Sequence, residues 1–210
     1  MTELPALIAA FTTLFVIIDP PGLTPLFLAL TQGMTPSQRR VIAIRSVVIA
    51  FCLMVAFILL GEALLGFIGI SMPAFRIAGG VLLFLTALEM LFQKRQARRE
   101  DNATEGGEEH TEDPSVFPLA LPLIVGPGAI TTLILLAGQS EGVVDVLAII
   151  GVVVAVLLIL LAFLFASNPV ERVLGKTGLN IVTRVLGMLL AALAIQFVLD
   201  GISQTFGIGA

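Results

Sequence analysis

A helix break with an acid inside it interrupts the first apolar stretch of the chain, Leu4 to Leu30. The break reads Asp19-Pro20-Pro21-Gly22. Each proline removes a backbone donor and clashes with the carbonyl four residues before it, so this stretch cannot form one unbroken helix. In a bilayer, the backbone groups freed by such a break must face protein or a water-filled cavity, because lipid offers no hydrogen bonds.

Asp19 is the only ionisable residue within this break. An ionisable side chain at membrane depth costs at least about 2.5 kcal/mol on insertion scales and is a functional candidate by default. The alternative is a structural role, in which Asp19 caps a second half-helix that begins at Pro20. The two roles can coexist.

A second break lies in the other half of the chain, at Gly126-Pro127-Gly128, within an apolar run from Phe117 to Ala137. This break contains no acid. Interrupted apolar segments at corresponding positions of two halves are the best indication in a sequence of a transporter's binding site.

The composition is that of a polytopic membrane protein. Hydrophobic residues make up 58% and charged residues 12% of the 210 residues, and the mean hydropathy is +1.08, whereas soluble domains carry about 25% charged residues. Seven of the fifteen acids lie between Glu100 and Asp113, so the net charge of −4 largely reflects this one segment. Nucleic acid binding is not indicated. Because Cys52 and His110 are single, an internal disulfide and a histidine or thiolate metal site in the membrane are excluded, and we expect no cofactor.

Six apolar segments each approach the ~20 residues that cross a hydrocarbon core. We therefore predict an all-α polytopic membrane protein with six transmembrane helices, of which the first and fourth are broken. The expected segments are Leu4 to Leu30, Val41 to Ile68, Phe75 to Phe92, Phe117 to Ala137, Val143 to Ala166 and Leu179 to Leu199.

A charged connection, residues 94–114, separates a first three-helix unit (1–93) from a second (115–210). Basic residues gather in the first, third and fifth connections, whereas the opposite side has only Arg76 near a membrane boundary. Under the positive-inside rule these connections face the cytoplasm, and both termini lie outside. The N-terminus lacks the positive region of a signal peptide, so we expect the first helix to be retained.

The two halves are predicted to form an inverted repeat. A shift of 106 residues places Pro21 on Pro127, and a shift of 108 places Arg76 on Arg184. Each half has three spans, an odd number, so equivalent halves must have opposite orientations in the membrane.

Three motifs, distributed over both halves, resemble those of one family: Asp19-Pro20-Pro21-Gly22, Ala74-Phe75-Arg76-Ile77-Ala78-Gly79-Gly80, and Phe117-Pro118-Leu119-Ala120-Leu121-Pro122 with Gly126-Pro127-Gly128-Ala129-Ile130-Thr131. At these residues the chain resembles the MarC family of integral membrane proteins, over nearly its whole length apart from the acidic segment. The resemblance implies a six-span protein of the bacterial or archaeal cytoplasmic (inner) membrane, grouped with LysE-type exporters. It is similar to relatives of the SnatA type, which move small neutral amino acids, glycine and alanine among them.

A small zwitterion needs one partner for its carboxylate and one for its ammonium. Half-helices that restart after Pro21-Gly22 and Pro127-Gly128 would offer free N–H groups and partial positive charge. Asp19 could receive the ammonium or carry a coupling proton. Arg76 and Arg184 could hold the carboxylate, pair with Asp19 or snorkel to the interface. Threonine hydroxyls could contact the substrate or bond their own backbone. The candidate binding residues are Asp19, Pro20, Pro21, Gly22, Thr24, Arg76, Gly126, Pro127, Gly128, Thr131, Thr132 and Arg184.

These features favour a transporter of small neutral amino acids or similar solutes, coupled to protons or sodium, with alternating access around a midplane site. Its partners would be the substrate, the coupling ion and membrane lipid. The alternatives are an exporter or channel for metal or other small ions, with Asp19 as an oxygen ligand, and a scaffold that transports nothing. Enzymatic function is not expected, because the apolar segments contain no histidine, metal-ligand pair or nucleophile motif. Gly79 and Gly187 mark small-residue surfaces that suit helix packing, sliding or a homodimer contact.

Overall fold

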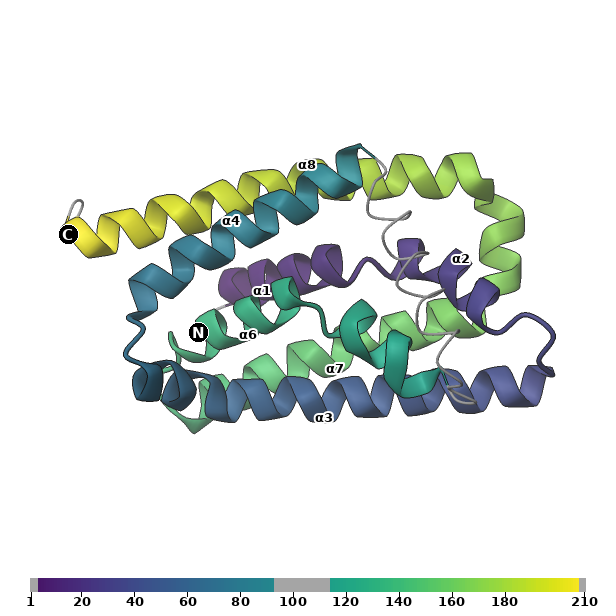
Figure 1. Ribbon diagram of the computed structural model, residues 1–210, viewed down its shortest axis with the longest axis horizontal. Helices are drawn as coiled ribbons and strands as arrows, with labels where there is room; N and C mark the ends of the chain where they lie inside the picture. The colour runs from purple at the N-terminus through teal and green to yellow at the C-terminus, as the bar shows by residue number, and fades with distance from the viewer. Residues whose placement is uncertain (1–3, 93–113, 208–210) are drawn as a thin grey trace.

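The computed structural model describes residues 4–92 and 114–207, and these residues form helices joined by short turns, with no strand among them (Figure 1). The predicted charged connection, residues 94–114, lies outside the described residues except for Pro114. The elements are α1 (Leu4–Ile18), α2 (Pro20–Leu30), α3 (Pro36–Ile68), α4 (Met72–Leu91), the π-helix η1 (Ser115–Ile124), α6 (Pro127–Ala137), α7 (Val143–Phe165) and α8 (Ser167–Phe206).

The described helices confirm the polytopic all-α class. Five segments are long and apolar enough to cross a membrane: α1 with α2, α3, α4, α7 and the Thr177–Phe206 part of α8. Together, η1 and α6 are long and apolar enough to be a sixth candidate span, and they are bent by 61° at their break. The last span begins late in α8 because Gly175, with φ of 61°, interrupts the helix before it.

Proline marks the start of four helices, α2, α3, α4 and α6. The first helical position suits proline, because the N–H that it lacks has no partner there and its φ is already helical. This preference corrects one expectation. The half-helices do not restart after Pro21-Gly22 and Pro127-Gly128 but begin at Pro20 and Pro127, so Gly22 and Gly128 lie within their first turns.

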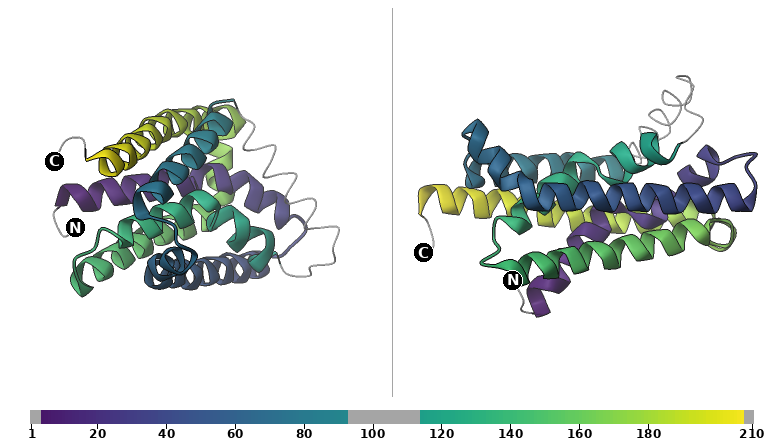
Figure 2. Two further views of the ribbon diagram at one scale, coloured as in Figure 1. Left: turned by 60° about the vertical axis from the view of Figure 1, so that its left-hand side comes forward. Right: turned by 90° about the horizontal axis from the view of Figure 1, so that it is seen from below.

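The two broken spans occupy the middle of the bundle, and the other helices surround them (Figures 1 and 2). The first span packs on α7 and the fourth packs on α3, while α1 and α6 contact each other. Nearly every residue of α6 is buried. In contrast, α3, α7 and α8 expose large apolar side chains such as Leu59, Leu158 and Val185, as helices facing lipid do.

Helices α4 and α8 form an antiparallel pair along one side of the bundle (Figure 2). Glycines permit their close approach: a Cβ at Gly80 would lie 2.8 Å from the Ala194 carbonyl oxygen, and one at Gly201 would lie 2.9 Å from the Pro73 carbonyl oxygen. The predicted small-residue position Gly187 also lies in this contact, against Met90 of α4. Small residues that bring backbones together stabilise such pairs through packing.

Candidate functional site

The first break is a left-handed aspartate between α1 and α2. Asp19 has φ of 56° and ψ of 64°, and its side chain is 1% exposed. Its Oδ1 accepts a hydrogen bond of 3.1 Å from the backbone N–H of Gly22, so Asp19 is the N-cap of α2. A Cβ at Gly22 would overlap the Asp19 carboxylate, so glycine is required there for the close approach of the cap. The capping role predicted for Asp19 is therefore present.

The prolines of this break also change the backbone of α1. In a continuous helix, the N–H groups of residues 20 and 21 would bond the carbonyls of Val16 and Ile17, but Pro20 and Pro21 have no N–H. All four residues are buried. The break thus brings main-chain carbonyl groups into the interior of the bundle, where α1 itself cannot satisfy them.

The second break lies between η1 and α6, and it differs from the first in having no side-chain cap. Gly126 is the N-cap residue of α6, with extended backbone at φ of −83° and ψ of 170°. The first helical hydrogen bond of α6 is donated by the N–H of Ile130 to the Gly126 carbonyl at 3.1 Å. The N–H groups of Gly128 and Ala129 therefore have no acceptor within α6, as at any helix start. This start of α6 suits a negatively charged ligand.

The two breaks meet in the middle of the bundle. A Cβ built at Gly128 would lie 3.4 Å from Cγ2 of Ile17 and 3.0 Å from Cδ2 of Leu83. Ile17 is two residues before Asp19, so the start of α6 lies against the end of α1. Glycine at position 128 thus permits the close approach of α6 to α1 and α4.

The threonines of the predicted set divide into two kinds. Thr24 is fully buried, and its hydroxyl donates to the Pro20 carbonyl at 3.0 Å, which is the backbone role considered as the alternative for it. The methyl group of Thr131 packs where α6 approaches Gly79 of α4. Thr132 is also fully buried, but its hydroxyl has no hydrogen-bond partner in the described residues. An unpaired hydroxyl in a protein interior costs about 1–3 kcal/mol and calls for an explanation.

Sequence reasoning missed Thr13, which is buried in α1 with 5% exposure. Thr13 precedes Ile17 by four residues, and Thr132 follows Gly128 by four residues. Helical spacing therefore places both threonines on the faces by which α1 and α6 approach each other. The sequence did contain a signal for Thr13, because a hydroxyl residue one helical turn before Ile17 lies on the same face of α1 as Ile17.

The two arginines do not come together at the breaks. Arg76 is buried at 5% exposure, but it is seven residues from Leu83, or roughly 10 Å along α4. Arg184 is exposed on α8. Because α4 and α8 are antiparallel, Arg76 lies toward the end of α8 and Arg184 toward the end of α4. The two arginines therefore lie toward opposite ends of the α4–α8 pair, and the contact of either one with a substrate carboxylate stays a prediction.

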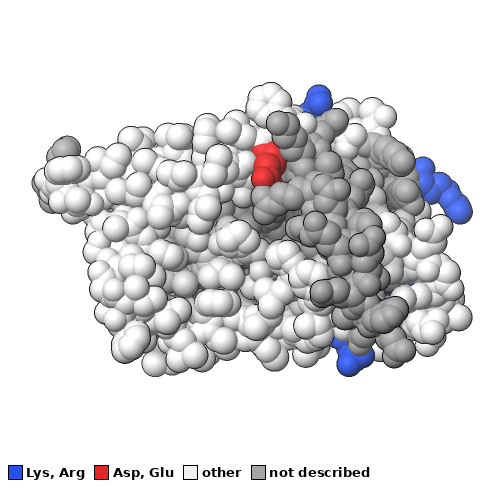
Figure 3. Space-filling model, viewed as in Figure 1, with Lys and Arg blue, Asp and Glu red and all other residues white. Residues whose placement is uncertain are grey.

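A cavity of about 440 Å³ leads from the surface of α4 to the second break. Thr86, Glu89 and Phe92 line it on α4, and Pro127 lines it at the start of α6. The face seen in Figure 3 has little charge, apart from one acidic patch and basic side chains toward one end of the bundle. Pro127, at the start of α6, is exposed at this cavity.

This arrangement defines a class: an integral membrane protein of six helical spans whose two interrupted spans meet in the bundle centre. The chain belongs to the MarC family of integral membrane proteins, whose family model matches residues 4–206. It is 38% identical over 201 residues to a UPF0056 membrane protein of Archaeoglobus fulgidus, covering 93% of this chain and 92% of the relative. It is 32% identical to the UPF0056 membrane protein YvbG of Bacillus subtilis, covering 95% of each chain.

A third relative is the UPF0056 inner membrane protein YhgN of Escherichia coli, which is 35% identical over 199 residues, with 93% of this chain and 95% of the relative covered. These names describe membrane proteins and state no activity. No solved structure matches the chain. The relatives from bacteria and archaea, with the family match, confirm the predicted resemblance and the multi-pass membrane protein.

Proposed function

We propose that this protein transports small neutral amino acids, or solutes of similar size, by alternating access around the two helix breaks, coupled to protons or sodium. The observation that carries the proposal is the contact of Gly128, at the start of α6, with Ile17, at the end of α1. Two interrupted helices that meet in a bundle centre bring helix ends and backbone polar groups to one place, away from lipid. A scaffold needs no such junction.

The two breaks offer complementary partners to a zwitterion. Asp19 places a buried carboxylate at the first break, and a carboxylate forms charge-assisted hydrogen bonds with an ammonium group. The start of α6 has no capping side chain, so the N–H groups of Gly128 and Ala129 suit the substrate carboxylate. Thr132 would add a hydroxyl one turn further along α6.

The helix packing supports the proposal that spans 1–3 and 4–6 form an inverted repeat. Exchange of the halves would convert the contact between spans one and five into one between spans four and two. Both contacts are present, because α1 and α2 pack on α7 while η1 and α6 pack on α3. The same exchange relates the contact of α4 with α6 to the contact of α8 with α1 and α2. Inverted repeats of this kind underlie alternating access in many transporters.

The distribution of basic residues supports the proposed orientation in a bacterial or archaeal cytoplasmic membrane. The basic side chains visible in Figure 3 lie in the half of the molecule that includes the end of α2 and the start of α3. Arg39 and Arg40 start α3, and Arg172 lies in the first part of α8 at the same end. Under the positive-inside rule this end faces the cytoplasm, so that both termini lie outside.

The test is uptake by purified protein in liposomes, under imposed proton or sodium gradients, with glycine, alanine, serine, leucine, lysine and divalent cations as solutes. We expect gradient-dependent uptake of glycine and alanine and little uptake of leucine, because the proposed substrates are small. Uptake of divalent cations alone would favour the ion exporter. Folded protein that moves no solute in the panel would favour the scaffold.

A substitution at Asp19 tests the site itself. Asp19→Asn retains a capping side chain but loses the charge, so a bound ammonium would lose a charge-assisted hydrogen bond of about 1.5–3 kcal/mol, or roughly ten- to a hundredfold in affinity. The matched control is Asp145→Asn, because Asp145 is also buried and accepts a bond of 3.0 Å from the Glu141 N–H at the start of α7. Near-normal coupled transport by the folded Asp19→Asn variant would overturn the assignment of the carboxylate.

A further inference from the structure

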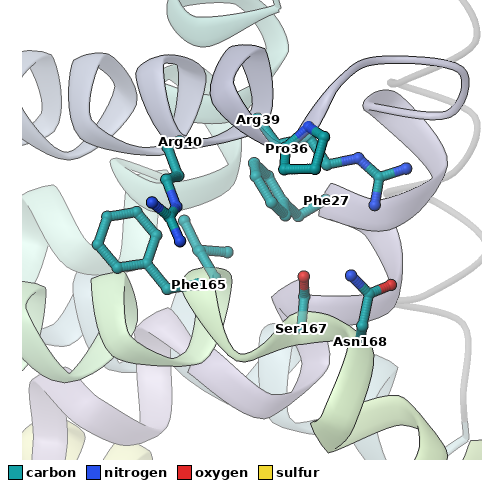
Figure 4. Close-up of a pocket in the computed structure, with 8 residues that line it drawn as sticks. Phe27, Pro36, Arg39, Arg40, Phe165, Ser167 and Asn168 are labelled. Carbon is teal, nitrogen blue, oxygen red and sulfur yellow. The ribbon is translucent and has the colours of Figure 1, made fainter.

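A small basic pocket lies at the end of the bundle where α2 ends, α3 begins and α7 joins α8 (Figure 4). Its volume is about 130 Å³. The first turns of α3 supply Arg39 and Arg40, and the start of α8 supplies Ser167 and Asn168. None of these residues belongs to the helix breaks, so the pocket is a second site.

The pocket presents hydrogen-bond donors from two directions. The Nε of Arg39 donates to the Thr31 carbonyl at 3.2 Å, which holds this side chain at the pocket while its terminal nitrogens remain available. Arg40 extends from the same helix on the other side of Phe27, beside Phe165 (Figure 4). No acidic side chain is found among the described residues that line the pocket. The electrostatic preference of the pocket is therefore for an anion.

Ser167 shows that the pocket is built for a polar ligand. Its side chain is 3% exposed and makes no hydrogen bond to any described residue, and Figure 4 shows its oxygen directed into the pocket. Ser167 is the first residue of α8, which has no side-chain cap. A buried hydroxyl normally finds a partner, and an uncapped helix start favours a negative one.

We propose that this pocket binds a phosphate-type anion, and that the anion is the headgroup phosphate of an anionic lipid. The guanidinium, hydroxyl and amide groups offer several donors to an oxyanion, and a lipid phosphodiester carries one negative charge on two non-bridging oxygens, with its ester oxygens as weaker acceptors. The pocket lies where the apolar spans end at Leu30 and Phe165 and begin at Pro36, which is the level of the lipid headgroups. Phe165 is 48% exposed at its rim and can contact an acyl chain.

The test is native mass spectrometry of the full chain in non-ionic detergent, titrated with phosphatidylglycerol or phosphatidylcholine. We expect tighter binding of phosphatidylglycerol, with Arg40→Gln weakening it by about tenfold or more and Ser167→Ala by about two- to tenfold. Arg45→Gln is the control for charge, since Arg45 is exposed on α3 and does not line the pocket; a general surface effect of about 1 kcal/mol predicts about a fivefold loss at most.

Ser167→Ala is the decisive variant, because it changes no charge and cannot act through the surface potential. Binding that is unaltered by Ser167→Ala, or weakened equally by Arg40→Gln and Arg45→Gln, would overturn the proposal. A second titration adds millimolar inorganic phosphate. Displacement of phosphatidylglycerol by phosphate would support the anion site with a soluble phosphate compound as its source, whereas retention of the lipid would support the headgroup.

Discussion

The unpaired hydroxyl of Thr132 makes a prediction in which stability and transport change in opposite directions. Valine has the same shape as threonine and the same branching at Cβ, so Thr132→Val changes little except the hydroxyl. A buried hydroxyl without a partner costs about 1–3 kcal/mol, and its removal should return part of that free energy. For a chain of this size, each 1 kcal/mol corresponds to a rise of about 2–4 °C in Tm.

Thr24→Val is the matched control, because Thr24 is equally buried and starts the other half-helix, but its hydroxyl is bonded to the Pro20 carbonyl at 3.0 Å. Loss of this hydrogen bond in Thr24→Val should lower the free energy of unfolding by about 0.5–1.5 kcal/mol. Thermal unfolding in detergent without substrate measures both variants. In liposomes, Thr132→Val should bind substrate about two- to tenfold more weakly, because a hydrogen bond is lost. If Thr132→Val loses stability as Thr24→Val does, its hydroxyl has a structural partner and the reasoning is wrong.

Two further predictions concern packing and orientation. Gly80→Ala should destabilise the protein by about 1–3 kcal/mol, because the new Cβ would meet the backbone of α8. Gly151→Ala is the control: its Cβ would meet nothing within 4 Å, so the change should be neutral or stabilising. Thermal unfolding compares the two variants. A reporter that works only outside the cytoplasm should be active when it is fused after Ala210, if the proposed orientation is correct. Activity of a reporter that works only in the cytoplasm would show that the orientation is the reverse.

The breaks and spans could be predicted from the sequence because their causes are local. Proline removes a donor wherever it stands, and an acid one residue before it can cap the next helix, so the break at Asp19 and its cap followed from a few residues. The exact start of α6 was predicted less well. Pro127 suits the first helical position better than a break inside the helix, and this preference moved the start to the proline itself.

The side-chain surroundings could not be predicted, because they depend on which helices meet. Nothing near Thr132 in the sequence shows that its hydroxyl lacks a backbone bond while that of Thr24 has one. The anion pocket joins Arg40 to Ser167, which are far apart in the chain and meet only because α3 and the start of α8 lie at one end of the bundle. Likewise, equivalent positions in two halves suggested a shared role for Arg76 and Arg184, but the antiparallel packing of α4 on α8 separates the two side chains.

The charge of Asp19 is not explained by its capping role. The free energies of capping and of burying a carboxylate support a role in function. Asparagine caps a helix about as well as aspartate and tolerates the left-handed backbone, with φ of 56°, equally well. The extra gain of a carboxylate at a helix start is about 0.3–1 kcal/mol, up to about 2, whereas its burial at membrane depth costs at least about 2.5 kcal/mol. Removing one partner of a buried charge pair is itself destabilising by about 3–5 kcal/mol, so a change in Tm alone does not separate the two roles. The deciding measurement is transport by protein that still folds, and we expect Asp19→Asn to insert and fold but to lose coupled transport. A clear fall in Tm together with normal transport would show instead that the carboxylate serves the fold.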